Sequence, residues 1–355
     1  MSMTGLWSKV FGRGSTLAST PAVPSAQPAS PSRTPVAAPP SKYRTSGKRD
    51  SRLSDLILLV DSLNFVGQAS QSPNKRWVVG STDRLPGMNS RLDHRDGSVV
   101  LLDYQADLVV LRVADLYRPM ESAVADNGAF VVCDANFGNR LSSVVLAFDD
   151  AQRKVLSRSY SANVFNLAIS KCGRYVVVQT ANAPGDDGNV LELFDLQTGK
   201  ALFSRQPETG WADQYEFAVG NDGLLEKLSV IHKDTGRFNY SPAGDFLDKA
   251  TFRKARLVKG PPEMRIYSAK DELKADPTNR ALAEELLPSL DAALKELDRA
   301  RIDYLATGLR AKGEILELLG RTAEAVSAYE EALIADPKVG IAKRVAKLKK
   351  KLEAG

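Results

Sequence analysis

Short apolar runs, rich in β-branched residues and separated by turn residues, recur along the chain between residues 55 and 232. Each of nine such runs is six to eight residues long, and runs of this length bounded by turns predict the strands of an all-β domain. The runs are 55–60, 76–81, 98–104, 107–113, 129–134, 142–149, 174–180, 189–195 and 225–232.

A turn followed by an apolar strand also repeats at a longer period. The copies are SPNKRWVV from Ser72, ADNGAFVV from Ala125, SKCGRYVV from Ser170 and a looser GNDGLL from Gly220. The third position of each copy follows the previous one by 53, 45 and 50 residues. A period of about 40–50 residues with four strands per unit is typical of the blades of a β-propeller.

The segment LFDLQTGKAL, which begins at Leu193, reads as a strand, a tight turn and a returning strand. Together with SKCGRYVV, it resembles the WD-repeat and YVTN-type propeller families over residues 65–250. Phe194 stands where those families carry Trp, and their Gly-His dipeptide is absent, so the resemblance is to the broad class. It implies a small propeller of about four blades, with the ranges 65–115, 118–160, 163–206 and 213–250.

How such a domain closes is left open by the sequence. Strand 55–60 could complete the last blade, as happens where the two ends of a propeller chain pair. The four units could instead form an open stack of sheets, or close only with strands from a partner.

Beyond Pro262 the apolar period changes to 3.6, which predicts amphipathic helices. The expected helices are 263–274, 279–300, 302–319, 322–335 and 339–352. Within them, residues 306–339 resemble one tetratricopeptide repeat, although Lys312 and Leu309 depart from its consensus. The matching positions, which the resemblance assigns to helix packing, are Gly313, Gly320, Ala325, Tyr329, Ala332 and Pro337. One repeat is fewer than the three that usually form a peptide groove.

The first 54 residues have a different composition. Residues 14–41 contain seven of the 18 prolines and no acidic residue, which predicts a disordered tether. Within the short motif 5–13, four apolar residues would form one stripe of a helix, suited to a partner's groove or an anionic membrane, or would be incidental. These residues are Leu6, Trp7, Val10 and Phe11. We therefore divide the chain into an arm (1–54), a β-propeller-like domain (55–258) and a TPR-like helical domain (261–355).

The formal net charge of +5 is unevenly distributed. Residues 1–54 hold eight basic residues and one acidic residue, residues 338–355 hold seven and one, and the remainder carries a net charge of −8. The basic C-terminal segment keeps Ile341, Val345, Leu348 and Leu352 on one stripe, which predicts a capping helix with solvated lysines rather than a nucleic-acid contact.

No motif for catalysis or cofactor binding stands out. The chain has no G-x-x-x-x-G-K-[ST], G-x-S-x-G, H-E-x-x-H or C-x-x-C, and two cysteines and two histidines predict neither a disulfide framework nor a metal site. The long loops 81–97, 134–141 and 181–188 would leave one face of a propeller, where recognition often occurs. The first of them supplies candidate partner-binding residues: Arg84, Arg91, Asp93, His94 and Asp96.

We therefore expect a non-enzymatic scaffold or adaptor that binds other proteins and uses no cofactor or metal. One alternative is a nucleic-acid- or membrane-surface-associated factor that uses the basic termini. Another is a ligand-sensing or enzymatic propeller in which His94 and its neighbouring carboxylates act as an acid or base. No apolar run approaches 18 residues and no Sec-type signal is evident, so a cytoplasmic location is expected.

Overall fold

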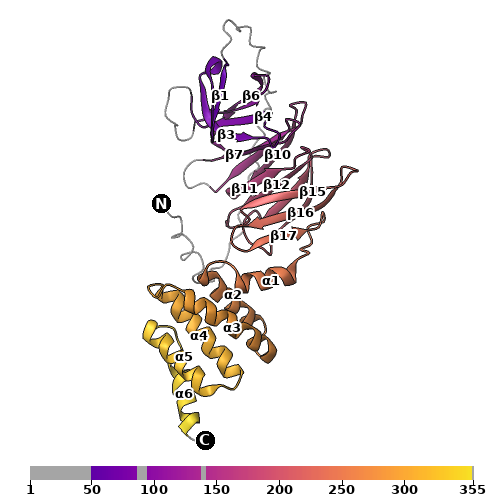
Figure 1. Cartoon of the computed structure of the whole chain (residues 1–355). Helices are drawn as coiled ribbons and strands as arrows, with labels where there is room; N and C mark the ends of the chain where they lie inside the picture. The colour runs from indigo at the N-terminus through magenta and orange to yellow at the C-terminus, as the bar shows by residue number, and fades with distance from the viewer. Residues whose placement is uncertain (1–48, 86–93, 137–140, 354–355) are drawn as a thin grey trace, which may run out of the picture. The chain divides into compact units, whose positions relative to one another are not determined.

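The computed structural model describes residues 49–85, 94–136 and 141–353, and Figure 1 shows their course. Within those residues, seventeen strands are followed by six helices. The strands form four sheets that follow one another along the chain, and the paired strands are antiparallel.

In the first sheet the six strands are β1 (Ser51–Ser54), β2 (Ile57–Val60), β3 (Phe65–Gln71), β4 (Trp77–Thr82), β5 (Gly97–Asp103) and β6 (Leu108–Leu116). The second contains β7 (Pro119–Val124), β8 (Phe130–Ala135), β9 (Ser143–Phe148) and β10 (Lys154–Tyr160). The third contains β11 (Val164–Ile169), β12 (Tyr175–Thr180), β13 (Leu191–Asp195) and β14 (Lys200–Arg205). The fourth contains β15 (Gln214–Val219), β16 (Leu225–His232) and β17 (Gly236–Tyr240). All nine predicted runs overlap strands.

Successive sheets pack face to face through alternating side chains. On β8, Phe130 and Val132 belong to an apolar cluster shared with the first sheet, whereas Val131 and Cys133 belong to one shared with the third. The third sheet is shared in the same way between the second and fourth. Because neighbouring residues of a strand point to opposite faces, the continuous apolar runs of the sequence are those of strands buried on both sides.

The outer face of the first sheet is covered by the sheet itself. Leu58 of β2 and Phe65 of β3 pack with Val78 of β4 in a separate cluster. The approach is so close that a Cβ atom at Gly80 would lie 2.8 Å from both Leu58 and Phe65. Glycine is required there because any side chain would collide with this covering layer.

The placement of β2 corrects one expectation from the sequence. Strand 55–60 does not complete the last sheet, because β2 pairs with β1 and β3. Its apolar residues are needed to cover the first sheet, and Asp107 helps to hold β1 by accepting hydrogen bonds from the backbone N–H of Asp50 (2.7 Å) and Ser51 (3.0 Å). Among the described residues, no apolar cluster joins the first sheet to the fourth.

The fourth sheet ends in a helix instead of a fourth strand. After β17 the chain makes a single bridge between Tyr240 and Phe246 and then enters α1 (Lys249–Val258). Phe252 of α1 packs edge-on against Phe238, with ring centroids 4.9 Å apart, and also against Phe246. The helix thus covers the apolar face that a further sheet would otherwise have to cover.

The remaining helices are α2 (Pro262–Ala275), α3 (Arg280–Glu296), α4 (Ile302–Leu318), α5 (Thr322–Ala335) and α6 (Ala342–Glu353). They share one apolar cluster, which includes Leu257 from the end of α1. All five helices expected from the periodicity are present.

The structure differs from the predicted domain limits in two places. Residues 51–54 form β1 although they were expected in the arm, and α1 lies inside the range expected to be propeller-like. The strand β1 is the short segment SRLS and is fixed by pairing with β2, while α1 is fixed by packing on the fourth sheet.

Candidate interaction surfaces

The repeated turns of the sequence have the same local geometry. Ser72 and Ser170 each accept, at Oγ, a hydrogen bond from the backbone N–H five residues later, at 3.0 and 2.9 Å. At the third position, Asn74, Asn127 and Asp222 accept at Oδ1 from the backbone N–H two residues later. These are the local hydrogen bonds for which Ser, Asn and Asp are favoured in turns.

The four turns are also joined to one another. The N–H of Asn74 donates to Oδ1 of Asp126 (2.7 Å), and the side chain of Asn127 donates to the carbonyl of Cys172 (3.1 Å). Arg174 then donates to the carbonyl of Gly223 (3.0 Å). We call this set of residues, 72–76, 125–129, 170–174 and 220–224, the turn row. Because each turn is bonded to the next, the turn row is one continuous surface.

Arginine–aspartate pairs fix the turn row to the strands. Arg174 makes two parallel bonds to Asp195, of 3.0 and 2.8 Å, and Arg76 contacts Asp103 in a similar position of the first sheet. Burial alone would raise the pKa of Asp195, but the hydrogen bonds and charge of Arg174, together with the hydrogen bond from the backbone N–H of Gln197, outweigh it and lower that pKa. The bidentate geometry restrains the arginine and the turn beside it.

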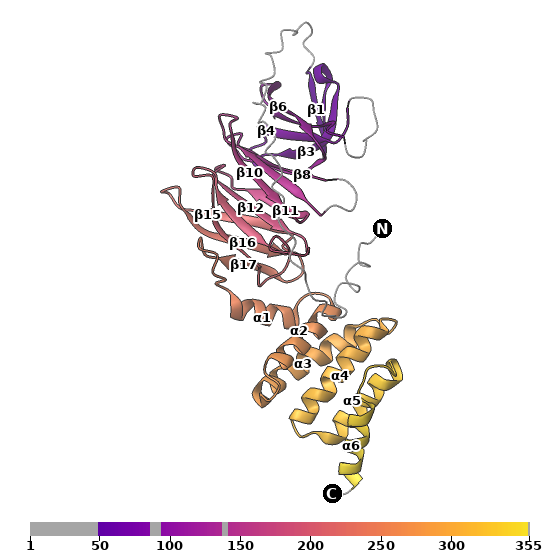
Figure 2. The ribbon, with the colours of Figure 1, turned by 180° about the vertical axis from the view of Figure 1, so that it is seen from behind.

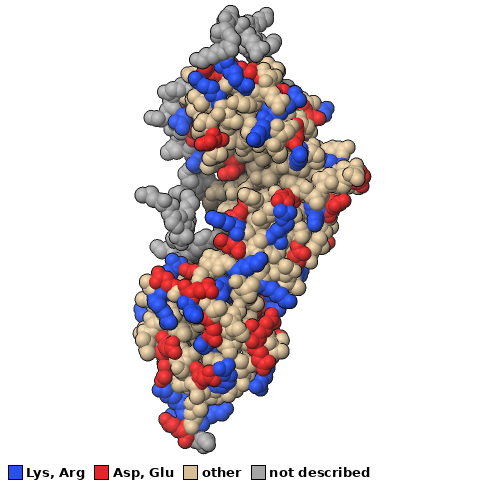
Figure 3. Space-filling view, in the orientation of Figure 1, with Lys and Arg blue, Asp and Glu red and all other residues tan. Residues whose placement is uncertain are grey.

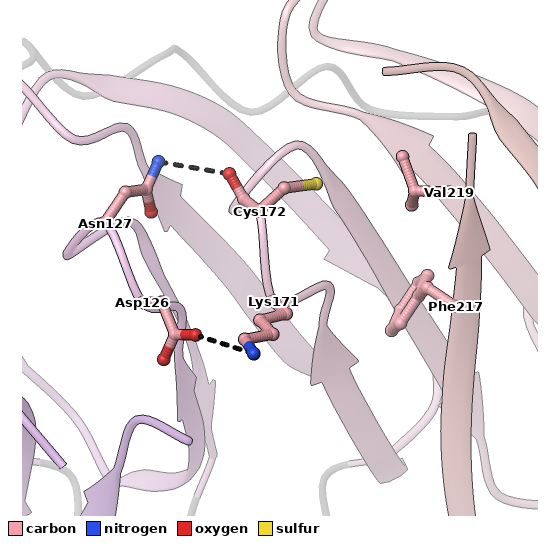
Figure 4. A pocket seen from close by; sticks show the side chains of 6 residues that line it. All are labelled: Asp126, Asn127, Lys171, Cys172, Phe217 and Val219. Atoms are coloured by element: carbon pink, nitrogen blue, oxygen red, sulfur yellow. Dashed lines mark hydrogen bonds and ion pairs between the residues drawn. The ribbon is translucent and has the colours of Figure 1, made fainter. Parts of the chain in front are cut away.

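A hollow opens on the turn row where the second, third and fourth sheets meet. Figure 4 shows two polar pairs on one side of it, with Nζ of Lys171 3.6 Å from Oδ2 of Asp126. The sulfur of the exposed Cys172 is directed toward the opposite, apolar side, which β15 supplies. The lining residues are Asp126, Asn127, Lys171, Cys172, Phe217 and Val219. The hollow thus has one polar side and one apolar side.

The long loops leave the sheets at the ends opposite the turn row, since they follow β4, β8 and β12 whereas the turns precede those strands. Of the predicted loop residues, Arg84 is exposed and lies 3.9 Å from Asp83, His94 is exposed, and Asp96 is half-buried. Arg91 and Asp93 lie outside the described residues.

Two acidic residues not singled out in the sequence organise this end. Asp134 accepts a hydrogen bond from the backbone N–H of Arg118 at 2.7 Å. This bond lowers the pKa of Asp134, but burial outweighs it and raises that pKa above its ordinary value. Asp187, in the loop 181–188, accepts from the N–H of Ser161 (2.7 Å) and from Arg158 (2.8 Å). Burial would raise the pKa of Asp187, but these bonds lower it. The sequence alone does not reveal the role of these two carboxylates, because their hydrogen-bond partners lie far from them along the chain.

The helical candidates are arranged as follows. Gly313 of α4 lies against the ring of Tyr329 of α5, and a Cβ atom at Gly313 would be only 2.4 Å from Cε1 of that ring. Tyr329, Ala325 and Ala332 are fully buried. Gly320 adopts a left-handed conformation (φ +80°) between the helices, and Pro337 is exposed after α5.

Several candidates fall elsewhere. The arm residues Leu6, Trp7, Val10 and Phe11 lie outside the described residues. In the described part of the chain there is no group of three or more His, Cys, Asp or Glu side chains suited to a metal ion. None of the described helices is long and apolar enough to cross a membrane.

Comparison with known proteins gives structural similarities only. No protein-family model matches the sequence, and a search of curated proteins gives no match. Among solved structures, the Dos1 propeller is similar over 50% of this chain and 44% of its own, with 14% identity and a TM-score of 0.35. The Kuenenia stuttgartiensis hydrazine synthase is similar over 52% and 46%, with 18% identity and a TM-score of 0.30.

A third similarity is to the Myceliophteria thermophila Cps50 (Swd1) beta-propeller domain, over 54% of this chain and 68% of that one, with 8% identity and a TM-score of 0.27. The chain thus spans less than half the length of the first two structures. At TM-scores this low, the similarities carry no argument about the fold, which is defined by the strand pairing and apolar clusters described above.

Proposed function

We propose that this chain is a protein-interaction scaffold that combines a propeller-like stack of four sheets with a TPR-like helical unit. The observation that carries the proposal is the turn row with its hollow. Hydrogen bonds link all four turns, and the hollow places Phe217 and Val219 opposite the polar residues Asp126 and Lys171. A preorganised surface of this kind binds a partner without first paying to order its loops.

The helical unit adds a second rigid platform. The close approach of Gly313 to Tyr329 and the burial of Ala325 and Ala332 support a TPR-like packing of α4 on α5. Small residues at these positions let two helices pack closely over their whole length. In this proposal the helices and the sheets hold separate protein partners.

The loop end of the sheets is a third candidate contact, through Arg84, His94 and Asp96. We assign these residues to partner binding rather than catalysis. The chain's other histidine, His232, lies at the end of β16, and the exposed Cys172 lies on the turn row. In the hollow, the sulfur of Cys172 is directed toward the apolar side and away from Asp126 and Lys171.

Site-specific photocross-linking in the full chain tests the turn row. A photoreactive residue replaces Lys171, whose side chain is 77% exposed beside the hollow, and a control replaces the exposed Lys154 on β10. The proposal expects a discrete set of cross-linked proteins from position 171 that position 154 does not give. Identical sets from the two positions, or none from position 171, would contradict it.

A further inference from the structure

Asp126 is the fixed charge of the hollow on the turn row. Its Oδ1 atom accepts a hydrogen bond from the backbone N–H of Asn74 (2.7 Å), and its carbonyl accepts one from the side-chain amide of Asn74 (2.9 Å). The N–H of Asp126 donates to the carbonyl of Lys171 (3.1 Å). Only 18% of the Asp126 side chain is exposed. The carboxylate is therefore held in place before any partner arrives.

The second carboxylate oxygen of Asp126 has no hydrogen-bond donor within the part of the chain that the structure describes. Its ionic neighbour there is Nζ of Lys171 at 3.6 Å, which is too long for a hydrogen bond. The side chain of Lys171 is 77% exposed, so it can turn into solvent without breaking a close contact. Oδ2 of Asp126 is thus a fixed acceptor on the wall of the hollow, and a cation from outside can pair with it.

The apolar side of the hollow comes from another sheet. Phe217 and Val219 belong to β15, which pairs with β16 in the fourth sheet (Figure 2), and both side chains are half-buried. Figure 4 shows them across the hollow from Asp126 and Lys171. A side chain that fills the hollow must therefore present an apolar surface to β15 and a hydrogen-bond donor to Asp126.

Three kinds of partner side chain differ in what each would leave unpaired. An aliphatic side chain would cover Oδ2 of Asp126 without giving it a donor, which is unfavourable for a charged group. A carboxylate would lie beside Asp126 and would have to immobilise Lys171, whose flexible side chain would lose its rotamer freedom. A cationic side chain supplies the missing donor and displaces only the mobile Lys171.

The turn row already holds arginines between a carboxylate and an aromatic ring. Arg174 donates to Asp195 at 2.8 Å, and its Cζ atom lies 5.1 Å from the centroid of the Tyr175 ring. Arg76 has the same surroundings at the first turn. A planar guanidinium can pair with a carboxylate and lie against a ring at the same time, which an ammonium group does less well. The hollow, with Asp126 on one side and Phe217 on the other, offers the same two partners.

Charge over the wider surface gives no competing preference. Over the face drawn in Figure 3, the basic and acidic side chains of the described residues are interspersed. Because neither sign dominates that face, the choice of partner depends on fixed local groups such as Asp126.

We propose that the hollow binds an arginine side chain of a protein partner. The guanidinium donates to Oδ2 of Asp126, the aliphatic stem and the flat guanidinium pack on Phe217, and Lys171 moves into solvent. This proposal rests on the proposed function of the turn row as a protein-binding surface, and it adds the chemistry of the side chain that is recognised.

Disulfide tethering in the full chain tests the proposal, because the exposed Cys172 lines the hollow whereas Cys133 is buried. The probes are cysteamine amides of N-acetylated arginine, citrulline, lysine, glutamate and leucine, each joined to β-mercaptoethanol by a disulfide. The thiol of Cys172 exchanges with this disulfide, which forms the protein–probe disulfide and releases β-mercaptoethanol. Intact mass gives the fraction of the chain that carries each probe as β-mercaptoethanol is increased. Cys172→Ser should carry none.

The arginine probe should withstand about tenfold more β-mercaptoethanol than the citrulline probe, which has the same shape without the charge. Asp126→Asn should remove this difference, because the amide still accepts from Asn74 through Oδ1 but carries no charge. The matched control is Asp150→Asn, at an exposed aspartate between β9 and β10, and it should leave the difference unchanged. Lys171→Gln should strengthen the retention of the arginine probe, because it removes the competing cation.

Equal retention of the arginine and citrulline probes, or of the arginine and lysine probes, would overturn the proposal. So would a preference for the glutamate probe that Lys171→Gln removes, because the hollow would then select an anion. A preference for the leucine probe that Asp126→Asn does not change would assign the hollow to an apolar side chain. The cross-linking at position 171 is a separate measurement: proteins captured there without a preference for arginine would leave the turn row as a binding surface and refute only the arginine assignment.

Discussion

Replacing Gly313 with Ala tests the helix packing most directly. In most helix interiors this change is stabilising, by about 0.5–1 kcal/mol, because Ala loses less backbone entropy on folding. Here the added methyl would lie 2.4 Å from Cε1 and 2.5 Å from Cδ1 of Tyr329. Tyr329 is fully buried, so its ring cannot move aside without displacing its neighbours.

The two effects have opposite signs and can be separated. Overpacking of a buried contact costs about 1–3 kcal/mol, which exceeds the propensity gain, so we expect Gly313→Ala to lower the free energy of unfolding by about 1 kcal/mol. In a Tyr329→Leu background the aromatic ring is gone. There the same substitution should stabilise the helices by about 0.5–1 kcal/mol relative to Tyr329→Leu alone.

Urea unfolding with two probes measures this. Far-ultraviolet circular dichroism follows the helices, while fluorescence follows the three tryptophans, Trp7, Trp77 and Trp211, which precede α1–α6 in the sequence. Only the helical transition should shift. Gly320→Ala is the control, because its left-handed φ of +80° with open space around it should cost the same in both backgrounds. A rise in the midpoint for Gly313→Ala in the unaltered chain would refute the packing argument.

Three further predictions concern the sheets. Phe252→Ala should destabilise the fourth sheet by about 3–5 kcal/mol, measured as the urea midpoint of tryptophan fluorescence. Asp195→Asn should lower the free energy of unfolding by about 1–3 kcal/mol, because it weakens the pair with Arg174. Since the pKa of Asp195 is lowered in the folded chain, the unaltered chain loses this stability as the pH falls through the acidic range, whereas the variant should not show that loss. Burial lowers the pKa of His232 below its ordinary value of 6.5, although the negative charge of Asp213 acts in the opposite direction. The free energy of unfolding should therefore fall as the pH drops below about 6.5, and His232→Phe should make that fall less steep. Thermal unfolding at several pH values measures this.

The parts of the fold that sequence reasoning located are those set by local interactions. The turns at Ser72 and Ser170 are closed by hydrogen bonds within six residues, so their residue types carry the signal directly. The strands buried on both faces gave continuous apolar runs. The close contact at Gly313 follows a helical spacing that is equally visible in the sequence.

The first strand of each later sheet was harder to find. In β11 the sequence is VFNLAI, and Asn166 interrupts the apolar run. Its side chain donates to the carbonyls of Ala212 and Asp213, more than 40 residues away. A polar residue in that role is indistinguishable, in the sequence, from one in a loop.

The hollow on the turn row was missed for a similar reason. Asp126 and Lys171 belong to predicted turns, but Phe217 belongs to β15, a strand that no apolar run in the sequence predicted. The site exists only because three sheets bring these residues together. The two turns could be predicted from the sequence, whereas β15 and the meeting of all three segments depend on the stacking of the sheets.

That stacking raises a physical problem at each end, because a sheet at the end of a stack has an apolar face with no neighbour. The chain solves it differently at the two ends: the first sheet is covered by its own strands β2 and β3, and the fourth by α1. The second solution has a consequence for the whole molecule. Phe252 and Leu257 of this one helix belong to different cores, that of the fourth sheet and that of the helices. Since the same helix completes both cores, loosening it by Phe252→Ala should disturb the helical transition as well as the sheets.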